Sequence, residues 1–448
     1  MPRLAGTSRD RRRFVTHNAI AAAGTWSAGV FGLLLQAFIS HHFRPALYGQ
    51  AFAVFSFYII ITGPAAAFSR MVAWTTSRER AADAPERRES GALLRVTNAR
   101  LLGAGTLIGA ACIVAAPAIA QYLHVDASFV VLGALGTPFL LATSPLLASL
   151  QGEQRWVPWS VLSLGIALSR IAFVAIFVYP FGIAGVMLGT SVGAAVIYVI
   201  ALAMVWPQIR EGRRQTSGWR THWRFLVVSF ASTLTMSVLV GSDVLLVEHF
   251  FSARAGGQFS SAAVASRALY FAMNSLASVL FPVVASRHVG SRTARSAVTA
   301  SVALALGGGL LGLVVFSAGG HVILRSFSGR AYEAASSYIG WYALGMPMLA
   351  AILMLSNTQQ ILADLRLLWV LVPGAILKPL LIFFFHQSLL MVSLMSDVAI
   401  GALLVALALR YALLVRGHDR AARLTEEERL EPRTAQELVA TQAPRSVL

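Results

Sequence analysis

Six ionisable residues lie inside long apolar segments of this chain, where a charge is costly and usually kept for a function. Two are basic residues near the middle of their segments, Arg170 and Lys378, and Lys378 is the only lysine of the sequence. The others are Asp243, Glu248, Arg267 and Asp397. Such cations bind acidic groups, whereas a carboxylate shielded from water can take up and release a proton or bind a sodium ion.

Two interpretations of these residues stay open at the sequence level. Arg170 and Lys378 could face one cavity and hold a diphosphate, or each could pair with an acidic residue and fasten neighbouring helices. Glu248 lies at the end of its segment, so we expect it at the membrane interface. We predict a substrate-binding set and an ion-coupling set, which are Arg170, Lys378 and Arg267 for the substrate, and Asp243 and Asp397 for the ion.

The elements that position these residues are predicted to be membrane-spanning helices. Of the 448 residues, 57% are hydrophobic and 12% charged, and the mean hydropathy is +0.69. A helix of roughly 20 apolar residues crosses a bilayer, and continuous runs rule out the alternating strands of a barrel. The predicted spans are 16–40, 47–67, 99–121, 128–150, 157–179, 181–206, 224–248, 257–284, 296–318, 336–358, 367–386 and 391–415.

The net charge of +17 is explained by the side on which the arginines fall. With twelve spans and a cytoplasmic N-terminus, the outer loops contain only Arg44, Arg254, Arg325 and Arg330, and almost all the other arginines are cytoplasmic. An excess of arginine in cytoplasmic loops sets the orientation of membrane proteins. We therefore predict a multi-pass protein of a bacterial inner membrane with both termini in the cytoplasm, and no nucleic-acid partner.

Several classes of protein are excluded by what the sequence lacks. It has no phosphate-binding loop of an ATPase, no cysteine–histidine cluster for a metal, and a single cysteine, Cys112. Its longest predicted outer loop, 319–335, is too short for the external domain of a membrane glycosyltransferase. We predict a carrier that is not an enzyme and has no metal or cofactor beyond a coupling proton or sodium ion.

An internal repeat divides the chain into two halves at an offset of 208 residues. This shift places 43-FRPALYGQ-50 on 251-FSARAGGQ-258 and aligns Gln151 with Gln359. It also aligns Arg170 with Lys378. Duplicated bundles are common in transporters. We predict an all-α protein of two six-helix lobes related by pseudo-two-fold symmetry. The predicted parts are a basic N-terminus at 1–15, a first lobe at 16–206, a linker at 207–223, a second lobe at 224–415 and a tail at 416–448.

Three stretches resemble the polysaccharide-flippase branch of the multidrug/oligosaccharidyl-lipid/polysaccharide exporter superfamily. They are 146-LLASLQGEQRW-156, the region 242–287 that closes with Phe-Pro, and 47-LYGQAFAV-54. The resemblance implies alternating-access transfer of a polyprenyl-diphosphate-linked oligosaccharide, such as a repeat unit of exopolysaccharide, capsule or O-antigen. Its implied partners are that lipid-linked oligosaccharide, membrane lipids, and the polymerase and glycosyltransferases of the same pathway.

The alternative reading is a multidrug and toxin exporter of the same superfamily, driven by proton or sodium antiport. Such exporters are expected to carry a carboxylate in the first span, and residues 16–40 contain none. A membrane polymerase or ligase acting on lipid-linked sugars is a third reading, which the short outer loops disfavour. The flippase is the predicted function.

Overall fold

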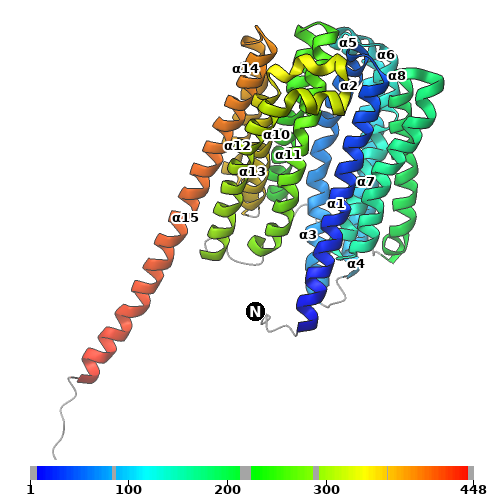
Figure 1. Ribbon diagram of the computed structural model, residues 1–448. Coiled ribbons are helices and arrows are strands. Elements are labelled where there is room, and N and C mark those ends of the chain that lie inside the picture. The colour runs from blue at the N-terminus through cyan, green and yellow to red at the C-terminus, as the bar shows by residue number, and fades with distance from the viewer. Residues whose placement is uncertain (1–7, 83–86, 212–222, 286–291, 361, 442–448) are drawn as a thin grey trace, which may run out of the picture.

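The computed structural model describes residues 8–82, 87–211, 223–285, 292–360 and 362–441. Every regular element in these ranges is a helix. Figure 1 shows two bundles side by side, one formed by the N-terminal half and the other by the C-terminal half. The predicted fold class, an all-α protein of two lobes, is confirmed. The predicted N-terminal segment 1–15 and linker 207–223 lie partly outside the described residues.

The first lobe begins with two long apolar helices and continues through shorter pieces. Its elements are α1 (Ser8–His42), α2 (Pro45–Thr62), η1 (Gly63–Ala65), α3 (Ala66–Ala82), α4 (Arg87–Val114), α5 (Ala116–Leu123), α6 (Ala127–Ala134), α7 (Thr137–Gly152) and α8 (Trp156–Glu211). Proline stands in the first turn of α2, α5 and α7, where its missing N–H costs nothing. Helices α2, η1 and α3 follow one another without a gap, so the second predicted span, 47–67, continues well beyond its predicted end.

Helix α8 turns back on itself at Gly182 and so contributes two crossings. Gly182 has φ +57° and ψ −136°, a conformation that is essentially limited to glycine. The reversal separates the predicted spans 157–179 and 181–206. Glycines then let the two arms pack closely, since a Cβ on Gly189 would lie 2.6 Å from the backbone nitrogen of Val174.

The second lobe repeats this pattern with longer helices. Its elements are α10 (Trp223–Phe250), α11 (Ala253–Ala285), α12 (Arg292–Ser328), η2 (Arg330–Ser337), α13 (Ile339–Gln360), η3 (Leu365–Leu367), α14 (Leu368–Phe384) and α15 (Leu389–Thr441). Nine helical stretches of the described chain are long and apolar enough to cross a membrane. One of these stretches holds both arms of α8 and so counts as two crossings. Helices α1 and α11 are not among the nine but also run the height of the bundle (Figure 1), and with them the number of crossings agrees with the predicted twelve.

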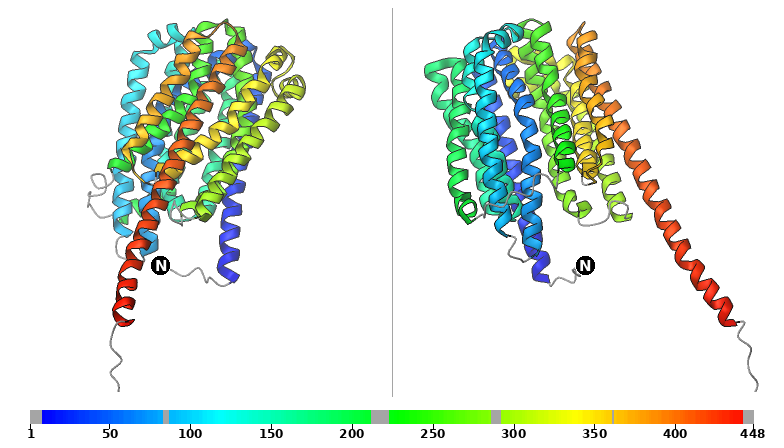
Figure 2. Two further views of the ribbon diagram at one scale, coloured as in Figure 1. Left: turned by 90° about the vertical axis from the view of Figure 1, so that its left-hand side faces the viewer. Right: turned by 180° about the vertical axis from the view of Figure 1, so that it is seen from behind.

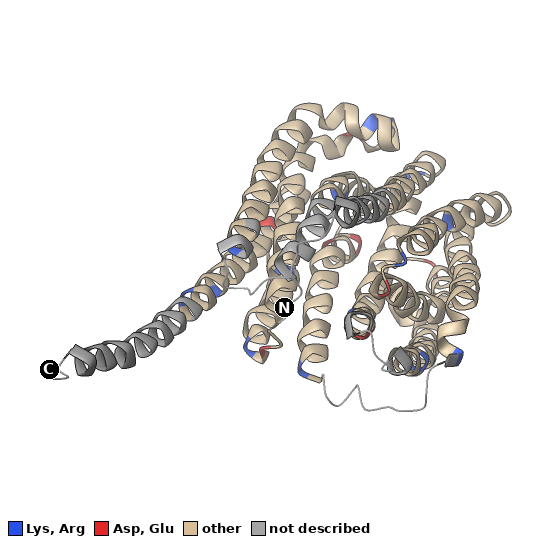
Figure 3. Ribbon diagram, turned by 90° about the horizontal axis from the view of Figure 1, so that it is seen from below, with Lys and Arg blue, Asp and Glu red and all other residues tan. Residues whose placement is uncertain are grey.

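The two ends of the molecule differ in charge. The N-terminus and the extended helix α15 lie at the same end (Figure 2). We call it the basic end because Arg155, before α8, Arg224, in the first turn of α10, and Arg366, in η3, lie there. Figure 3 views the molecule from this side. The opposite end, the far end, carries the α1–α2 and α10–α11 connections and η2.

Contacts at the far end support the predicted repeat. The Gln50 side chain donates to the carbonyl of His124 at 3.2 Å, and Gln258, 208 residues later, donates to the carbonyl of Ala331 at 3.0 Å. Gly49 and Gly257, another pair at this offset, lie against each other, since a Cβ on Gly49 would be 2.6 Å from the nitrogen of Gly257. Equivalent residues of the two halves therefore meet where α2 of the first lobe crosses α11 of the second.

Side chains complete the closure of the lobes at the far end. The hydroxyl of Tyr332 donates to the carbonyl of Phe43 at 3.0 Å, and the hydroxyl of Ser40 lies 3.3 Å from the carbonyl of Phe327. A ring nitrogen of His249 is 2.7 Å from the carbonyl of Tyr122. Each contact joins one lobe to the other.

We predict that Gly257→Val forces the lobes apart at the far end. A Cβ at this position would lie 1.7 Å from the carbonyl oxygen of Pro45, which is backbone and cannot move aside alone. Spin labels replacing the exposed Arg44 and Arg330, in a chain whose single cysteine has been replaced, should report a longer distance between the lobes. Gly307→Val is the control, because nothing lies within 4 Å of a Cβ there. An unchanged distance in Gly257→Val would contradict this packing.

Candidate functional site

A buried ion pair lies at the centre of the second lobe. The ammonium of Lys378 on α14 is 2.7 Å from Oδ2 of Asp243 on α10, and both side chains are 0% exposed. The same ammonium donates to the backbone carbonyl of Leu239, one turn earlier on α10. The sequence shows Lys378 as a charge within an apolar segment. In the structure this charge is compensated by the Asp243 carboxylate on a neighbouring helix.

Tyr342 on α13 completes the surroundings of Asp243. Its hydroxyl donates to Oδ2 of Asp243 at 2.7 Å, and the backbone N–H of Val244 lies 2.9 Å from Oδ1. Both carboxylate oxygens therefore accept hydrogen bonds, which a buried charge requires. The sequence prediction missed Tyr342, because a tyrosine near the end of a span is equally typical of a membrane interface.

Asp397 on α15 is the second carboxylate of this cluster. It lies close enough to Lys378 and Asp243 to interact electrostatically with both. Its Oδ2 atom is buried and has no hydrogen-bond partner. Gly345 on α13 makes room for it, because a Cβ there would lie 2.4 Å from Oδ1 of Asp397. The cluster therefore contains one fully bonded carboxylate and one with an unused oxygen.

Arg267 on α11 connects the cluster to the first lobe. Its guanidinium donates to the carbonyl of Val240 on α10 at 2.6 Å. It also lies 5.1 Å from the centre of the Phe52 ring on α2, a distance typical of a cation–π contact. Because Phe52 belongs to the first lobe, this contact would be altered by a movement of one lobe against the other.

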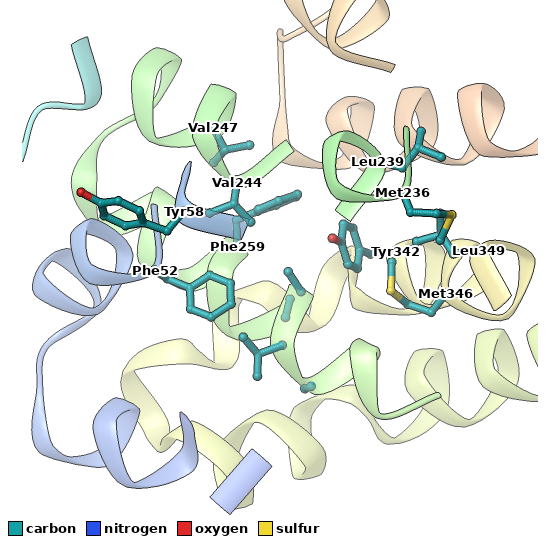
Figure 4. Packing of buried hydrophobic residues seen from close by; sticks show 14 of the residues in the cluster. Phe52, Tyr58, Met236, Leu239, Val244, Val247, Phe259, Tyr342, Met346 and Leu349 are labelled. Carbon is teal, nitrogen blue, oxygen red and sulfur yellow. The ribbon is translucent and has the colours of Figure 1, made fainter. Parts of the chain in front are cut away.

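An apolar shell surrounds the cluster. Figure 4 shows Tyr342 near Met236 and Leu239 of α10 and near Met346 and Leu349 of α13, all of them buried. In such surroundings the charges of Lys378 and Asp243 are poorly screened, so the attraction between them is much stronger than at a surface.

Arg170 lies in the other lobe, apart from this cluster. It lines a cavity of about 180 Å³ formed by residues of α7 and of both arms of α8. The structure therefore brings together Lys378, Asp243, Arg267 and Asp397, and it places the repeat-related pair Arg170 and Lys378 in different settings. Lys378 pairs with an acidic residue of a neighbouring helix, which was one of the two interpretations. Arg170 lines a cavity, but Lys378 does not share it.

Glu248 does not reach a membrane interface as expected. Its side chain is 1% exposed, and neither carboxylate oxygen has a hydrogen-bond partner. It lies at the crossing of α2 and α11, where a Cβ on Gly256 would be 2.1 Å and one on Gly49 2.9 Å from its Oε2. The expectation was wrong because the end of α10 packs against α2 of the first lobe and against α11. These helices cover the Glu248 side chain at the far end.

Neither a protein-family model nor a curated protein sequence matches this chain. Solved structures with the same fold do match. One is an inward-facing conformation of a multidrug resistance MATE family transporter of the MOP superfamily, with a TM-score of 0.70, 14% identity, and coverage of 88% of this chain and 99% of that chain. An outward-facing conformation of such a transporter has a TM-score of 0.62 at 13% identity, covering 90% and 95%. A variant of the Vibrio cholerae MATE transporter VcmN has a TM-score of 0.67 at 14% identity, covering 91% and 97%.

The fold is therefore that of MATE transporters of the MOP superfamily. At 13–14% identity these matches show the fold alone, and none of the three is described as a polysaccharide transporter.

The predicted function, a lipid-linked oligosaccharide flippase, is contradicted by these matches to multidrug MATE transporters. The motif 146-LLASLQGEQRW-156 that suggested a flippase has a structural explanation. It forms the end of α7, where a Cβ on Gly152 would lie 2.7 Å from the carbonyl oxygen of Ala73, and where Gln154 takes a left-handed φ of +56°. These residues end a helix and pack it against α3, which accounts for Gly152 and Gln154 without a sugar.

The chemistry that the cluster offers is that of a cation site. Carboxylate, hydroxyl and carbonyl oxygens suit a proton or a hard cation such as sodium. Within the described residues no group of three or more histidine, cysteine, aspartate and glutamate side chains could hold a metal ion. The predicted roles in substrate binding and ion coupling remain predictions.

Proposed function

We propose that this protein exports small organic molecules by alternating access, driven by proton or sodium antiport. The observation that carries the proposal is the acid–lysine cluster buried in one lobe of a MATE-type fold. An ion-driven exporter needs a buried group that loads and unloads a cation, and the cluster contains two carboxylates. The first span has none between residues 16 and 40, so the coupling site is placed in the second lobe.

Asp397 is the proposed site of ion loading. Lys378 already neutralises Asp243, whereas one oxygen of Asp397 has no partner. A proton or sodium ion bound to Asp397 removes its negative charge, and the net charge of the cluster rises by one. Because the carboxylate lies directly against Gly345, this change acts on the contact between α15 and α13. A change of packing within the second lobe is then passed to α2 through Arg267 and Phe52.

The basic end is proposed to face the cytoplasm of a bacterial inner membrane. Arginine-rich connections are retained on that side, and both termini leave the bundle there (Figure 2). The closed far end then faces outward, so the structure corresponds to the state that accepts cargo from inside the cell. A change to the outward-facing state requires the Gly49–Gly257 crossing to open.

The proposal is tested with the full-length protein in liposomes. A panel of small organic acids, amines and neutral compounds is offered with an imposed pH gradient, with a sodium gradient, or with none. We expect at least one compound to accumulate against its gradient only when one of the two ions is supplied. Failure of both gradients to drive any compound would contradict ion-driven export.

A further inference from the structure

The cavity in the first lobe contains an unpaired positive charge. Arg170 lines it and has no carboxylate or hydrogen-bonding partner in the part of the chain that the structure describes. Where side chains of this lobe are described, the carboxylates are Glu79, Asp126 and Glu153, all close to an end of the bundle. None of these described carboxylates is an ion-pair partner of the Arg170 guanidinium. Lys378, its counterpart in the repeat, has one.

The depth of Arg170 excludes a lipid phosphate as the missing partner. It lies fourteen residues after Trp156 at the basic end, or about 21 Å along α8, and twelve before Gly182 at the far end, or about 18 Å, given 1.5 Å per residue. This position is close to the centre of a hydrocarbon core about 30 Å thick. Lipid headgroups lie outside that core, so a partner of opposite charge must enter as cargo.

The other side chains of the cavity show what such cargo looks like. Five of the ten lining residues are aliphatic, namely Leu140, Leu147, Ile166, Ala194 and Ile197, and the hydroxyl of Ser144, which also lines the cavity, donates to the carbonyl of Leu140 at 3.4 Å. The hydroxyls of Thr143 and Ser169 also line the cavity, and they donate to the carbonyls of Phe139 at 2.6 Å and Ile166 at 3.1 Å. Since these hydroxyl protons are already used, the cavity offers hydrogen-bond donors mainly through Arg170. Such a cavity suits a molecule with one acidic group on an apolar body.

We propose that the cavity at Arg170 binds the acidic group of the cargo, so that this exporter carries small apolar acids. This inference rests on the proposed export function and adds the class of substrate to it. An organic amine would meet the positive charge of Arg170 without a carboxylate to offset it. The volume of about 180 Å³ is comparable to that of an apolar cavity of about 150 Å³ that binds benzene. A single-ring acid such as benzoate is therefore a suitable probe.

The test measures binding to the purified full-length protein by calorimetry, with benzoate, benzamide and benzylamine as probes of the same shape and different charge. We expect benzoate to bind and benzylamine to bind far more weakly. Arg170→Gln should weaken benzoate binding by roughly 10- to 100-fold, the usual value of a hydrogen bond to a charged group. Arg170→Lys should retain part of the affinity, because it keeps the charge and loses the paired donors. Arg210→Gln, an exposed arginine on the same helix, is the matched control and should bind like the wild type.

Three results would overturn the proposal: no benzoate binding by the wild type, stronger binding of benzylamine than of benzoate, or unchanged benzoate binding by Arg170→Gln. Equal melting temperatures of the variants and the wild type ensure that a loss of binding is not a loss of folding. The ion-driven transport assay is separate. Ion-driven export of amines that Arg170→Gln leaves intact would keep the proposed function and overturn the acid-binding cavity.

Discussion

Lys378→Met is expected to destabilise the folded protein by about 3–5 kcal/mol, the typical cost of removing one partner of a buried ion pair. The substitution leaves Asp243 charged in an apolar shell with only the Tyr342 hydroxyl and a backbone N–H to stabilise it. Methionine fills a similar volume, so the loss is electrostatic. The free energy of unfolding, or the melting temperature of the purified protein, measures the effect.

A double variant separates the charge from the packing. Lys378→Met combined with Asp243→Asn removes both charges and should recover most of the stability lost by Lys378→Met alone, because no unpaired charge is left. A double variant as unstable as the single one would show that the pair is not what holds α14 against α10.

Asp397→Asn is expected to abolish ion-driven transport and leave the protein folded. Asparagine has the same shape but cannot take up a proton and binds a sodium ion poorly. The Oδ2 atom of Asp397 has no hydrogen-bond partner, so replacing this oxygen with an amide nitrogen breaks no hydrogen bond. The measurement is uptake of a transported compound under a pH or sodium gradient, which should fall to the level of protein-free liposomes at an unchanged melting temperature.

Asp364→Asn is the matched control for this substitution. Asp364 lies at the basic end, outside the cluster, where it pairs with Arg410 at 2.7 Å. Transport by this variant should therefore keep its dependence on the ion gradient. Equal ion-driven uptake by Asp397→Asn and the wild type would place the coupling site elsewhere.

The fold could be predicted from the sequence because its signals are local. Apolar runs long enough to cross a bilayer, arginines on one side and a repeat at an offset of 208 residues together indicate two helical lobes. The repeat proved informative in detail, since Gln50 and Gln258 make equivalent hydrogen bonds and Gly49 meets Gly257. The breaks at Ala115 and Gly136 within the predicted spans 99–121 and 128–150 were not predicted, because both sides of each break are apolar.

The candidate site could be predicted only in part. A charge in an apolar segment is visible in the sequence, so Asp243, Lys378 and Asp397 were found. Their partners depend on which faces of the helices meet, and spacing along the chain does not determine this. For the same reason the burial of Glu248 against Gly256 and the hydrogen bond of Tyr342 could not be foreseen.

The error in function has the same origin. Similar folds can carry different cargo, and one of the three stretches that resembled the flippase branch, 146–156, ends helix α7 and packs it against α3. Arg170 and Lys378 seemed to form a pair for a diphosphate because the repeat aligns them. The structure pairs Lys378 with Asp243, whereas Arg170 lines a cavity in the other lobe. Equivalent positions in two lobes can therefore serve different purposes.

Exchange of cargo for a cation at Asp397 can be driven backwards. Liposomes containing the protein are given a gradient of a transported compound and no ion gradient, and the movement of protons and of sodium is recorded. We expect one of these ions to move opposite to the compound with the wild type, and neither ion to move with Asp397→Asn. Movement of the compound without either ion, or wild-type ion movement with Asp397→Asn, would contradict this expectation.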